Sequence, residues 1–524
     1  MCICFGGIVK IDNNSNNKWK EVIITIHVLM IFAGLPLVYR DYYFDILAVK
    51  YYFYCSCVII MSILILGYGI YAKVKRYDEY KRIIKCDITD IAILTFWIFS
   101  LLSTVFSPYK FEAFWGNEGR LSGFFLLTLY TVSYFFITRW FRLKQWHLDL
   151  FLAAGIMICL LGITDYFRLD ILSFKVRMSK EQYEMFTSTI GNINTYTAYV
   201  GLVMAVSVTL FVISKDLKRS CFYFVTTVTC FFAIIMGTSD NAYISLGVLL
   251  LLLPCFVFDY GMKLRRYLIV ISTLFTVIQC IDFINTYMGS KVLGIDSAFN
   301  LIIQYKWLSS IVVVLWIMTI IAYIFRYLHK EKDDRLSNHY RNIWMIFTGV
   351  IILAISFIFY DANFGGHPER YNSISNYIVF NDAWGTYRGF VWKLGMEEYM
   401  KLPLINKIFG SGPETLGILL SLNRRGEMVS VANQIYDAAH NEYLQFFITI
   451  GPFGLAAYIT FLVSSTIKIV KNISQLPYLL GIAMAIVCYS AQAIINISLP
   501  ITTPIFLTLL MCGIAACRYQ NNEQ

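Results

Sequence analysis

The sequence predicts an all-α polytopic membrane protein, and three observations support this fold class. Hydrophobic residues make up 58% of the 524 residues, charged residues make up 15%, and the mean hydropathy is +0.63. Apolar runs recur that are long enough to cross a hydrocarbon core, which takes about 20 helical residues. Lys and Arg residues gather in alternate connections between these runs. A soluble domain is excluded because there are too few polar residues to cover its surface.

The apolar runs predict about fourteen transmembrane helices. In chain order, we expect these helices at 22–39, 51–72, 88–106, 121–138, 146–165, 191–214, 221–236, 241–259, 267–286, 307–328, 343–360, 441–467, 476–496 and 500–517. Only the short segment 237–240 separates the seventh helix from the eighth. If these two form a re-entrant hairpin, the number of spans falls to twelve.

The basic residues orient the chain in the membrane. With the N-terminus inside, the majority of the 43 Lys and Arg residues fall on cytoplasmic connections, as the positive-inside rule requires. No Lys or Arg is then left in the middle of a predicted helix, where a charge is costly. We expect one membrane domain with both termini in the cytoplasm. It has helices 1–11 within residues 1–360, one large extracytoplasmic loop at 361–440, and helices 12–14 within 441–524.

The net charge of +10 follows from this topology. Basic cytoplasmic connections are typical of membrane proteins and attract anionic lipid head groups, so the lipid bilayer is an expected partner and nucleic acid is not. None of the 13 cysteines lies in 361–440. They are expected to act as small core residues, without a disulfide framework or a metal site.

The extracytoplasmic loop holds most of the polar residues outside the spans, together with segments that are expected to fold. From Thr386 to Met400, apolar and aromatic residues recur at helical spacing. A short amphipathic helix on the membrane surface is therefore expected, ending before Pro403. The glycine turn 409–413 allows its backbone to approach a ligand or another helix closely. The loop ends at His440, just before an apolar helix.

A series of motifs follows one another along the chain. They are Trp115-Gly-Asn-Glu-Gly-Arg-Leu-Ser-Gly123, Ile190-Gly-Asn-Ile-Asn-Thr195, Arg388 between Tyr387 and Trp392, Gly410-Ser-Gly-Pro-Glu414, Ala439-His-Asn-Glu-Tyr-Leu-Gln445 and Gly451-Pro-Phe-Gly454. In this order and on this topology, they resemble the O-antigen ligase and Wzy-type polysaccharide polymerase family of bacterial envelope enzymes. The resemblance covers residues 110–515, and its specific part is 385–455. Pro452 departs from the family pattern, and the N-terminal part of the chain is unmatched.

The resemblance implies a glycosyltransferase that moves a glycan from undecaprenyl diphosphate to an acceptor hydroxyl on the outer face of the cytoplasmic membrane. Arginine suits the departing diphosphate because its planar fork donates paired hydrogen bonds. A neutral imidazole suits the acceptor because it can take the hydroxyl proton. His440 and Arg388 are therefore the implied catalytic residues, and inversion at the anomeric carbon is expected. The residues implied to contact substrate are Arg120, Asn441, Tyr387, Glu414 and Asn192.

Neither a metal nor another cofactor is expected. Metal-dependent transfer from a diphosphate needs carboxylate ligands, and no Asp-x-Asp pair occurs on the predicted outer side. Metal independence is also what the resemblance implies.

Several of these residues have simpler interpretations. Asn441 and Asn192 stand where they would cap helices, and Arg388 is placed to reach lipid head groups. Arg424 and Arg425 are expected to form a solvated basic pair, and Arg424→Ala is expected to be nearly silent.

Two alternatives stay open. A lipid-linked glycan flippase or another secondary transporter has a similar number of helices, but its mark would be ionisable groups inside the spans. Within the enzyme interpretation, the acceptor is either a second lipid-linked glycan, as for a polymerase, or a different molecule, as for a ligase.

Overall fold

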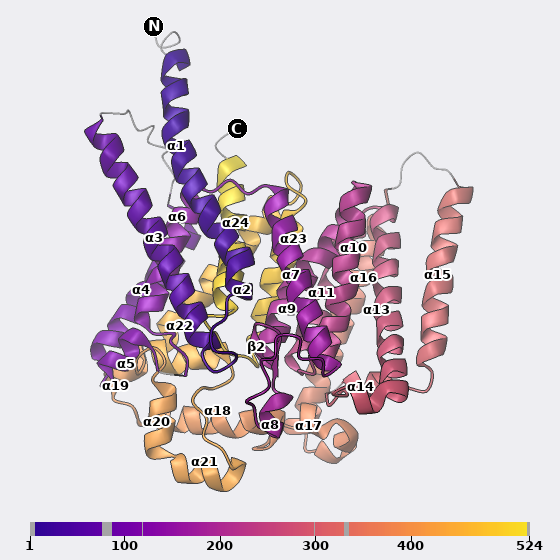
Figure 1. Cartoon of the computed structure of the whole chain (residues 1–524). Coiled ribbons are helices and arrows are strands. Elements are labelled where there is room, and N and C mark those ends of the chain that lie inside the picture. The colour runs from indigo at the N-terminus through magenta and orange to yellow at the C-terminus, as the bar shows by residue number, and fades with distance from the viewer. Residues whose placement is uncertain (1–5, 76–85, 118, 298, 330–334, 521–524) are drawn as a thin grey trace.

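The computed structural model describes residues 6–75, 86–117, 119–297, 299–329 and 335–520, and helices dominate it (Figure 1). Within these residues, ten helical stretches are long and apolar enough to cross a membrane. They are α1 with η1 and α2 (Gly6–Leu29, Met30–Gly34, Leu35–Leu37), α3 (Ile46–Val74), α4 (Ile88–Phe106), α7 (Gln145–Tyr166), α9 (Ile193–Ile213), α10 (Leu217–Met236), α13 (Gly261–Met288), α15 (Leu308–Leu328), α16 (Asn338–Asn363) and α22 (Glu442–Lys471). The shorter apolar helices are α6 (Phe124–Trp140), α11 with α12 (Asn241–Leu252, Pro254–Val257), α23 (Leu479–Gln492) and α24 (Thr503–Gln520).

Each of the fourteen predicted ranges overlaps one of these apolar helices. The all-α membrane class is therefore supported, while the number of spans stays a prediction because four of the helices are short. One boundary differs in a way that matters. Helix α3 begins at Ile46, so Lys50 lies inside it and is fully buried. Its Nζ donates to the carbonyl oxygens of Leu35, Pro36 and Val38 at 2.7–2.9 Å, which satisfies acceptors that the end of α2 leaves open.

The short elements gather at the end of the bundle opposite the described chain ends (Figure 1). They are α5 (Lys110–Trp115), α8 (Lys180–Tyr183), β1 (Phe186–Thr187), β2 (Gly191–Asn192), η2 (Gly289–Lys291), α14 (Phe299–Ile303), η3 (Pro368–Ile374), α17 (Ser375–Ile378), α18 (Trp384–Lys401), α19 (Leu404–Phe409), α20 (Leu416–Asn423) and α21 (Arg425–Ala432). The helix expected at 386–400 is present as α18 and ends before Pro403. Strands β1 and β2 form a small antiparallel hairpin.

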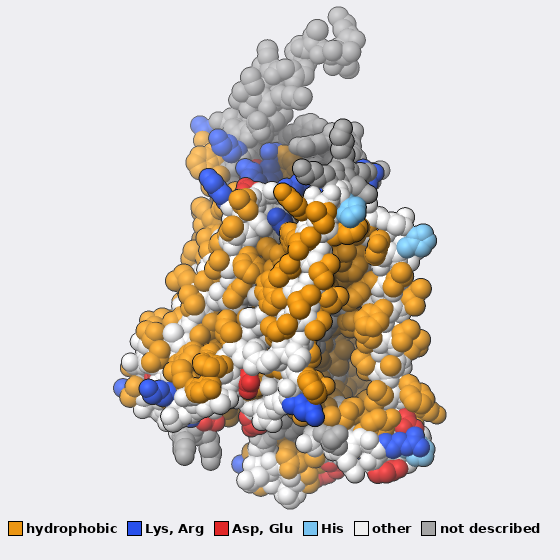
Figure 2. Space-filling model, turned by 90° about the vertical axis from the view of Figure 1, so that its right-hand side faces the viewer, with side chains coloured by type: hydrophobic (Ala, Val, Ile, Leu, Met, Phe, Trp, Pro, Cys, Tyr) orange, Lys and Arg blue, Asp and Glu red, His pale blue; other side chains and the backbone are white. Residues whose placement is uncertain are grey.

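The bundle has a buried centre and an apolar outer surface. Helix α9 is almost enclosed: 94% of the residues in its most apolar 18-residue stretch are buried. The corresponding fractions are 11% in α15 and 6% in α16. Hydrophobic side chains cover the middle of the face that Figure 2 shows, while most charged side chains lie towards its two ends. This distribution suits a hydrocarbon environment around the middle of the bundle.

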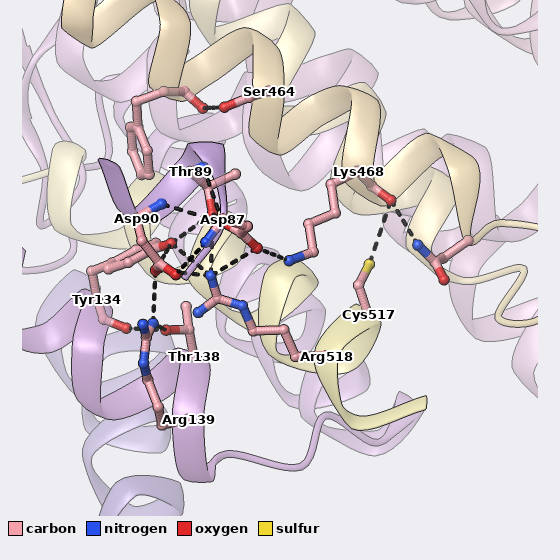
Figure 3. Close-up of polar contacts among 12 residues, drawn as sticks. Asp87, Thr89, Asp90, Tyr134, Thr138, Arg139, Ser464, Lys468, Cys517 and Arg518 are labelled. Carbon is pink, nitrogen blue, oxygen red and sulfur yellow. Dashed lines mark hydrogen bonds and ion pairs between the residues drawn. The ribbon is translucent and has the colours of Figure 1, made fainter. Parts of the chain in front are cut away.

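A cluster of charged side chains joins four helices (Figure 3). The fully buried carboxylate of Asp90 accepts from Arg139 Nη1 at 2.9 Å and from Arg518 Nη2 at 2.8 Å. Asp87 accepts from Lys468 and, at 3.1 Å, from the same Arg518 nitrogen. Because α4, α6, α22 and α24 each supply at least one of these groups, the cluster holds the four helices together. It also compensates the buried charge of Asp90.

Helix α22 is interrupted at Gly451, whose φ is +84°. Pro452 has no N–H to donate to the carbonyl of Ile448. That carbonyl instead accepts from the backbone N–H of Ser411 at 3.1 Å, and Thr449 O accepts from Gly412 N at 3.0 Å. The helix is therefore broken at Gly451 and Pro452, and the glycine turn at 409–413 docks at the break.

Candidate functional site

A cavity of about 280 Å³ lies at the end of the bundle that holds the short elements. Its walls come from five stretches that are distant in the sequence: the segment that leads into α3, the turn before α6, the β1–β2 hairpin with the start of α9, His440 ahead of the N-cap of α22, and the connection between α23 and α24. The lining residues are Tyr43, Phe44, Ile46, Leu47, Gly119, Arg120, Phe186, Asn192, Asn194, Thr195, His440, Asn496, Ile497, Leu499 and Ile501. Three of the predicted site residues therefore share one cavity: Arg120, Asn192 and His440.

The backbone around His440 is held from both sides. The N–H of Ala439 donates to Gln445 Oε1 at 3.0 Å, and the carbonyl of Ala439 accepts from Trp392 Nε1 at 2.7 Å. On the other side, Asn441 Oδ1 caps α22 by accepting from Leu444 N at 3.0 Å. Asn441 therefore caps the helix, as its position in the sequence suggested. The cap holds Asn441, the neighbour of His440, at the start of α22.

Arg120 is bound to a carboxylate that the sequence analysis did not select. Arg120 donates through Nε to Asp437 Oδ2 at 3.0 Å and through Nη2 to Asp437 Oδ1 at 2.5 Å. The Arg120 side chain is 13% exposed and that of Asp437 is 42% exposed, so water reaches the carboxylate of the pair but little of the guanidinium. Gly417 lets helix α20 approach, since a Cβ there would lie 2.5 Å from the carbonyl oxygen of Asp437. Asp437 therefore orients the guanidinium that lines the cavity.

Arg388 begins the regular part of α18. Gly385, Thr386 and Tyr387 before it all have positive φ, and Arg388 Nη1 donates to the carbonyl of Gly385 at 3.1 Å. Among the described residues, no ion pair within 4.0 Å involves Arg388. Burial lowers its pKa, and the negative charge of Asp240 opposes this effect. The guanidinium thus keeps capacity for an anion.

The electrostatic environment of His440 keeps its imidazole neutral. Burial, followed by the positive charges of Arg120 and Arg388, lowers the pKa of His440 to about 3, and the carboxylate of Asp437 opposes this shift only in part. Both guanidinium groups therefore lie within electrostatic range of the imidazole. At neutral pH, His440 carries no proton on one ring nitrogen and can accept one.

Glu414 lies in a smaller adjoining pocket that shares Arg120 and Ile497 with the cavity. It is 7% exposed, and burial raises its pKa to about 7, while the charge of Arg120 acts in the opposite direction. Glu414 is therefore poised to change its protonation state near neutral pH.

Three of the predicted site residues have backbone conformations that non-glycine residues rarely adopt. The φ angles are +65° at Tyr387, +61° at Glu414 and +49° at His440. Such conformations persist where the surrounding contacts enforce them, and they cluster at functional sites. Other described residues outside the predicted site, such as Arg168 and Asp170, also have positive φ, so this geometry is not specific to the site.

The start of α9 combines capping with cavity lining. Asn192 Oδ1 accepts from Asn194 N at 2.9 Å, as a cap does. Ser239 Oγ donates to Asn194 Oδ1 at 2.6 Å, and Asn496 Nδ2 donates to Asn194 O at 3.3 Å. The two interpretations of Asn192 are thus compatible, since its oxygen caps the helix while the residue lines the cavity.

Not every predicted site residue lines the cavity. Tyr387 packs against the apolar core of the loop, Asn441 acts as a helix cap, and Arg388 lies near enough to His440 to affect its pKa without lining the cavity wall. Of the groups that the sequence analysis missed, Asp437 had one available signal, because it lies three residues before His440.

The interpretation of Arg424 as part of a solvated basic pair was wrong. Its guanidinium binds Glu398 at 2.6 Å, Glu397 at 2.7 Å and Glu427 at 2.8 Å, and its side chain is 17% exposed. These contacts join α18 to the start of α21, because α18 presents the adjacent carboxylates of Glu397 and Glu398 towards Arg424. Only Arg425 is exposed as expected.

Within the part of the chain that the structure describes, no three His, Cys, Asp or Glu side chains gather closely enough to hold a metal ion. No protein-family model matches the sequence, and no curated protein matches it.

Proposed function

We propose that this protein is a membrane glycosyltransferase that moves a glycan from undecaprenyl diphosphate to an acceptor hydroxyl on the outer face of the cytoplasmic membrane. One observation carries the proposal. His440 lines a cavity together with Arg120, and its pKa responds to the charges of both Arg120 and Arg388. A base for a hydroxyl and two cations for a diphosphate therefore occur together. The motif resemblance to the O-antigen ligase and polymerase family adds separate support.

The proposed reaction is a single displacement. The acceptor oxygen attacks the anomeric carbon of the donor sugar while the hydroxyl proton passes to the unprotonated nitrogen of His440. The bond from the anomeric carbon to the diphosphate oxygen breaks, and its electron pair leaves with undecaprenyl diphosphate. The glycan is transferred with inverted configuration, and His440 later releases the proton to water.

The low pKa of His440 fits a site that is activated by its substrate. Without a donor, the cations and burial hold the pKa at about 3, which makes the imidazole a weak base. A diphosphate bound beside Arg388 and Arg120 brings negative charge that offsets both guanidinium groups. The pKa of His440 then rises towards neutral pH, where general base catalysis is most effective.

The two arginines have different roles in this proposal. Arg388 takes part in no ion pair among the described residues and can offer paired hydrogen bonds to phosphate oxygens. Arg120 is held by Asp437 through two of its nitrogens, so it supplies a fixed positive charge at the cavity wall. Fixed charges assist a transition state because they need no reorganisation as the leaving group forms.

The proposed location places the cavity and the loop 361–440 outside the cytoplasm. Support comes from the basic connections at the opposite end of the bundle, where the described chain ends also lie. Reporter fusions at Asn363 and Asn433 should report the outside, and a fusion at Asn338 should report the cytoplasm. A cytoplasmic location for Asn363 and Asn433 would exclude the proposed reaction, because donor and acceptor meet on the outer face.

The activity is tested with purified protein in lipid nanodiscs and an undecaprenyl diphosphate-linked repeat unit. Release of undecaprenyl diphosphate together with a longer glycan supports a polymerase. If release needs an added acceptor, the enzyme is a ligase. A deletion strain separates the two cases in the cell: loss of a polymerase leaves single repeat units on lipid, and loss of a ligase leaves long chains there. Normal lipid-linked and surface glycans in that strain would refute the proposal.

A further inference from the structure

The cavity beside His440 has one wall made of aromatic side chains. Tyr43, Phe44 and Phe186 line it, and the rings of Tyr43 and Phe186 lie 5.3 Å apart at 40°. The hydroxyl of Tyr43 donates to the carbonyl of Ser188 at 2.9 Å, which fixes its ring against the hairpin. Aromatic rings offer a flat apolar face, and the C–H face of a pyranose ring is flat and apolar as well.

Another part of the cavity lining carries neutral hydrogen-bonding groups. Asn192, Asn194, Thr195 and Asn496 line it. The side-chain oxygens of Asn192 and Asn194 are used by a cap and by Ser239. Within the described residues, the Nδ2 groups of Asn192 and Asn194 and the hydroxyl of Thr195 make no hydrogen bond with the protein. Two amide donors and one hydroxyl therefore remain available to a ligand with many oxygens.

The charge balance of the cavity favours an uncharged ligand ring. Among the described residues, Arg120 is the one charged side chain that lines the cavity, and two of its nitrogens already bind the carboxylate of Asp437. His440 is neutral near pH 7 because its pKa is low. A carboxylate on a sugar ring would be desolvated here and would compete with the donor diphosphate for the positive charge of Arg120, which is unfavourable.

We propose that this cavity is a subsite for one uncharged sugar ring, namely the ring that is bonded to the diphosphate of the donor. Phe186 and Tyr43 pack against the ring, and the amide groups at the start of α9 bind its hydroxyl or N-acetyl groups. The volume of about 280 Å³ is at the small end of ligand pockets, which hold drug-sized molecules at about 300–1,000 Å³. The assignment to the first sugar rests on the proposed function, since the reacting carbon must lie beside the base and the cations.

Binding of lipid probes tests the subsite. The probes are undecaprenyl diphosphate alone, the same lipid bearing one N-acetylglucosamine, and the same lipid bearing one glucuronic acid, each measured against full-length protein in detergent micelles. For wild type, the neutral sugar should tighten binding relative to undecaprenyl diphosphate, and the acidic sugar should not. Phe186→Ala should weaken binding of the neutral-sugar lipid by about tenfold and leave binding of undecaprenyl diphosphate within about twofold. Thr195→Val keeps the shape of the side chain but removes its hydroxyl. It should weaken binding of the lipid that bears N-acetylglucosamine and leave binding of undecaprenyl diphosphate unchanged.

The matched control is Met185→Ala, next to Phe186 in sequence but exposed and outside the cavity lining. It should change no affinity. If Phe186→Ala weakens both lipids equally, the cavity holds the diphosphate or the prenyl chain, and the proposal is overturned. The proposal also fails if Phe186→Ala leaves both affinities unchanged in folded protein. Equal or tighter binding of the glucuronic acid lipid overturns the preference for an uncharged ring.

A separate measurement distinguishes failure of the subsite from failure of the proposed function. Methyl N-acetylglucosaminide at millimolar concentration should raise the unfolding temperature of wild type and should have no effect on Phe186→Ala. If wild type binds neither undecaprenyl lipid but shows this stabilisation, the proposed function is refuted while the sugar subsite stands. If the methyl glycoside has no effect on wild type, the subsite is refuted.

Discussion

The carboxyl of Glu414 should make the stability of this protein depend on pH, and Glu414→Gln should remove that contribution. Glu414 is 7% exposed, and burial raises its pKa from 4.5 to about 7. One pKa unit corresponds to about 1.4 kcal/mol, so ionised Glu414 costs about 3 kcal/mol of stability. Between pH 4.5 and pH 7, the folded state binds this proton more tightly than the unfolded state does. Stability therefore falls as pH rises through this window.

His440 acts in the opposite direction. Its pKa is lowered from 6.5 to about 3, so between these values the unfolded state binds more protons and stability rises with pH. Comparing Glu414→Gln with wild type cancels this contribution, because both proteins keep His440. The variant should match wild type at pH 4.5 and should exceed it by up to about 3 kcal/mol at pH 7.5.

The assay measures the unfolding temperature in detergent micelles from pH 4.5 to pH 8. All scans use one rate, because such proteins commonly unfold irreversibly and the unfolding temperature then depends on the scan rate. Glu184→Gln is the control, since Glu184 is exposed and takes part in no ion pair among the described residues. It should leave the profile unchanged. If Glu414→Gln shows the wild-type profile, folding does not shift the pKa of Glu414. If the variant loses stability relative to wild type as pH rises, the ionised carboxylate is stabilised instead. Either result contradicts the electrostatic description of the site.

Other predictions concern the loop and its attachment. Gly451→Ala should destabilise the protein by about 2 kcal/mol or more, since φ is +84° and a Cβ would lie 2.2 Å from Ile408 O; Gly426→Ala, with open space around it, should be neutral by thermal unfolding. Arg424→Ala should speed proteolysis of the loop several-fold by breaking three ion pairs, whereas Arg425→Ala should not; equal rates for the two would contradict a structural role for Arg424. Turnover of the lipid-linked donor should be the same in chelator as in added Mg²⁺, and a strict Mg²⁺ requirement would mean that arginines do not replace a metal.

The sequence was sufficient for the parts of the fold that depend on local composition. Apolar runs of sufficient length predicted where the helices lie, since a span must satisfy its own backbone hydrogen bonds. The helix at 384–401 was predicted from its spacing. Helix boundaries were less accurate: α3 begins at Ile46 because Lys50 finds three carbonyl partners in the preceding segment, and this tertiary contact leaves no local signal.

Part of the cavity lining was predicted, while its role as a functional site stays a prediction. Motifs selected His440, Arg120 and Asn192, and the structure brings these three to one cavity. The aromatic wall, with Tyr43 from the unmatched N-terminal part, could not be predicted because it depends on packing between distant segments. The pairing of Arg424 with the carboxylates of α18 was missed for the same reason: a charged pair in a polar loop has the same local pattern whether it is solvated or bound.

Donor binding and turnover of His440→Ala, measured on the same protein preparation, test the central claim most directly. The account predicts that the undecaprenyl diphosphate-linked donor still binds, because His440 acts on the acceptor hydroxyl, while turnover falls by about 10²–10⁴-fold. Arg388→Ala should instead weaken donor binding as well, since it removes a phosphate contact. Near-normal turnover in both variants, with correct insertion and folding, would show that the reaction takes place elsewhere or does not take place in this protein.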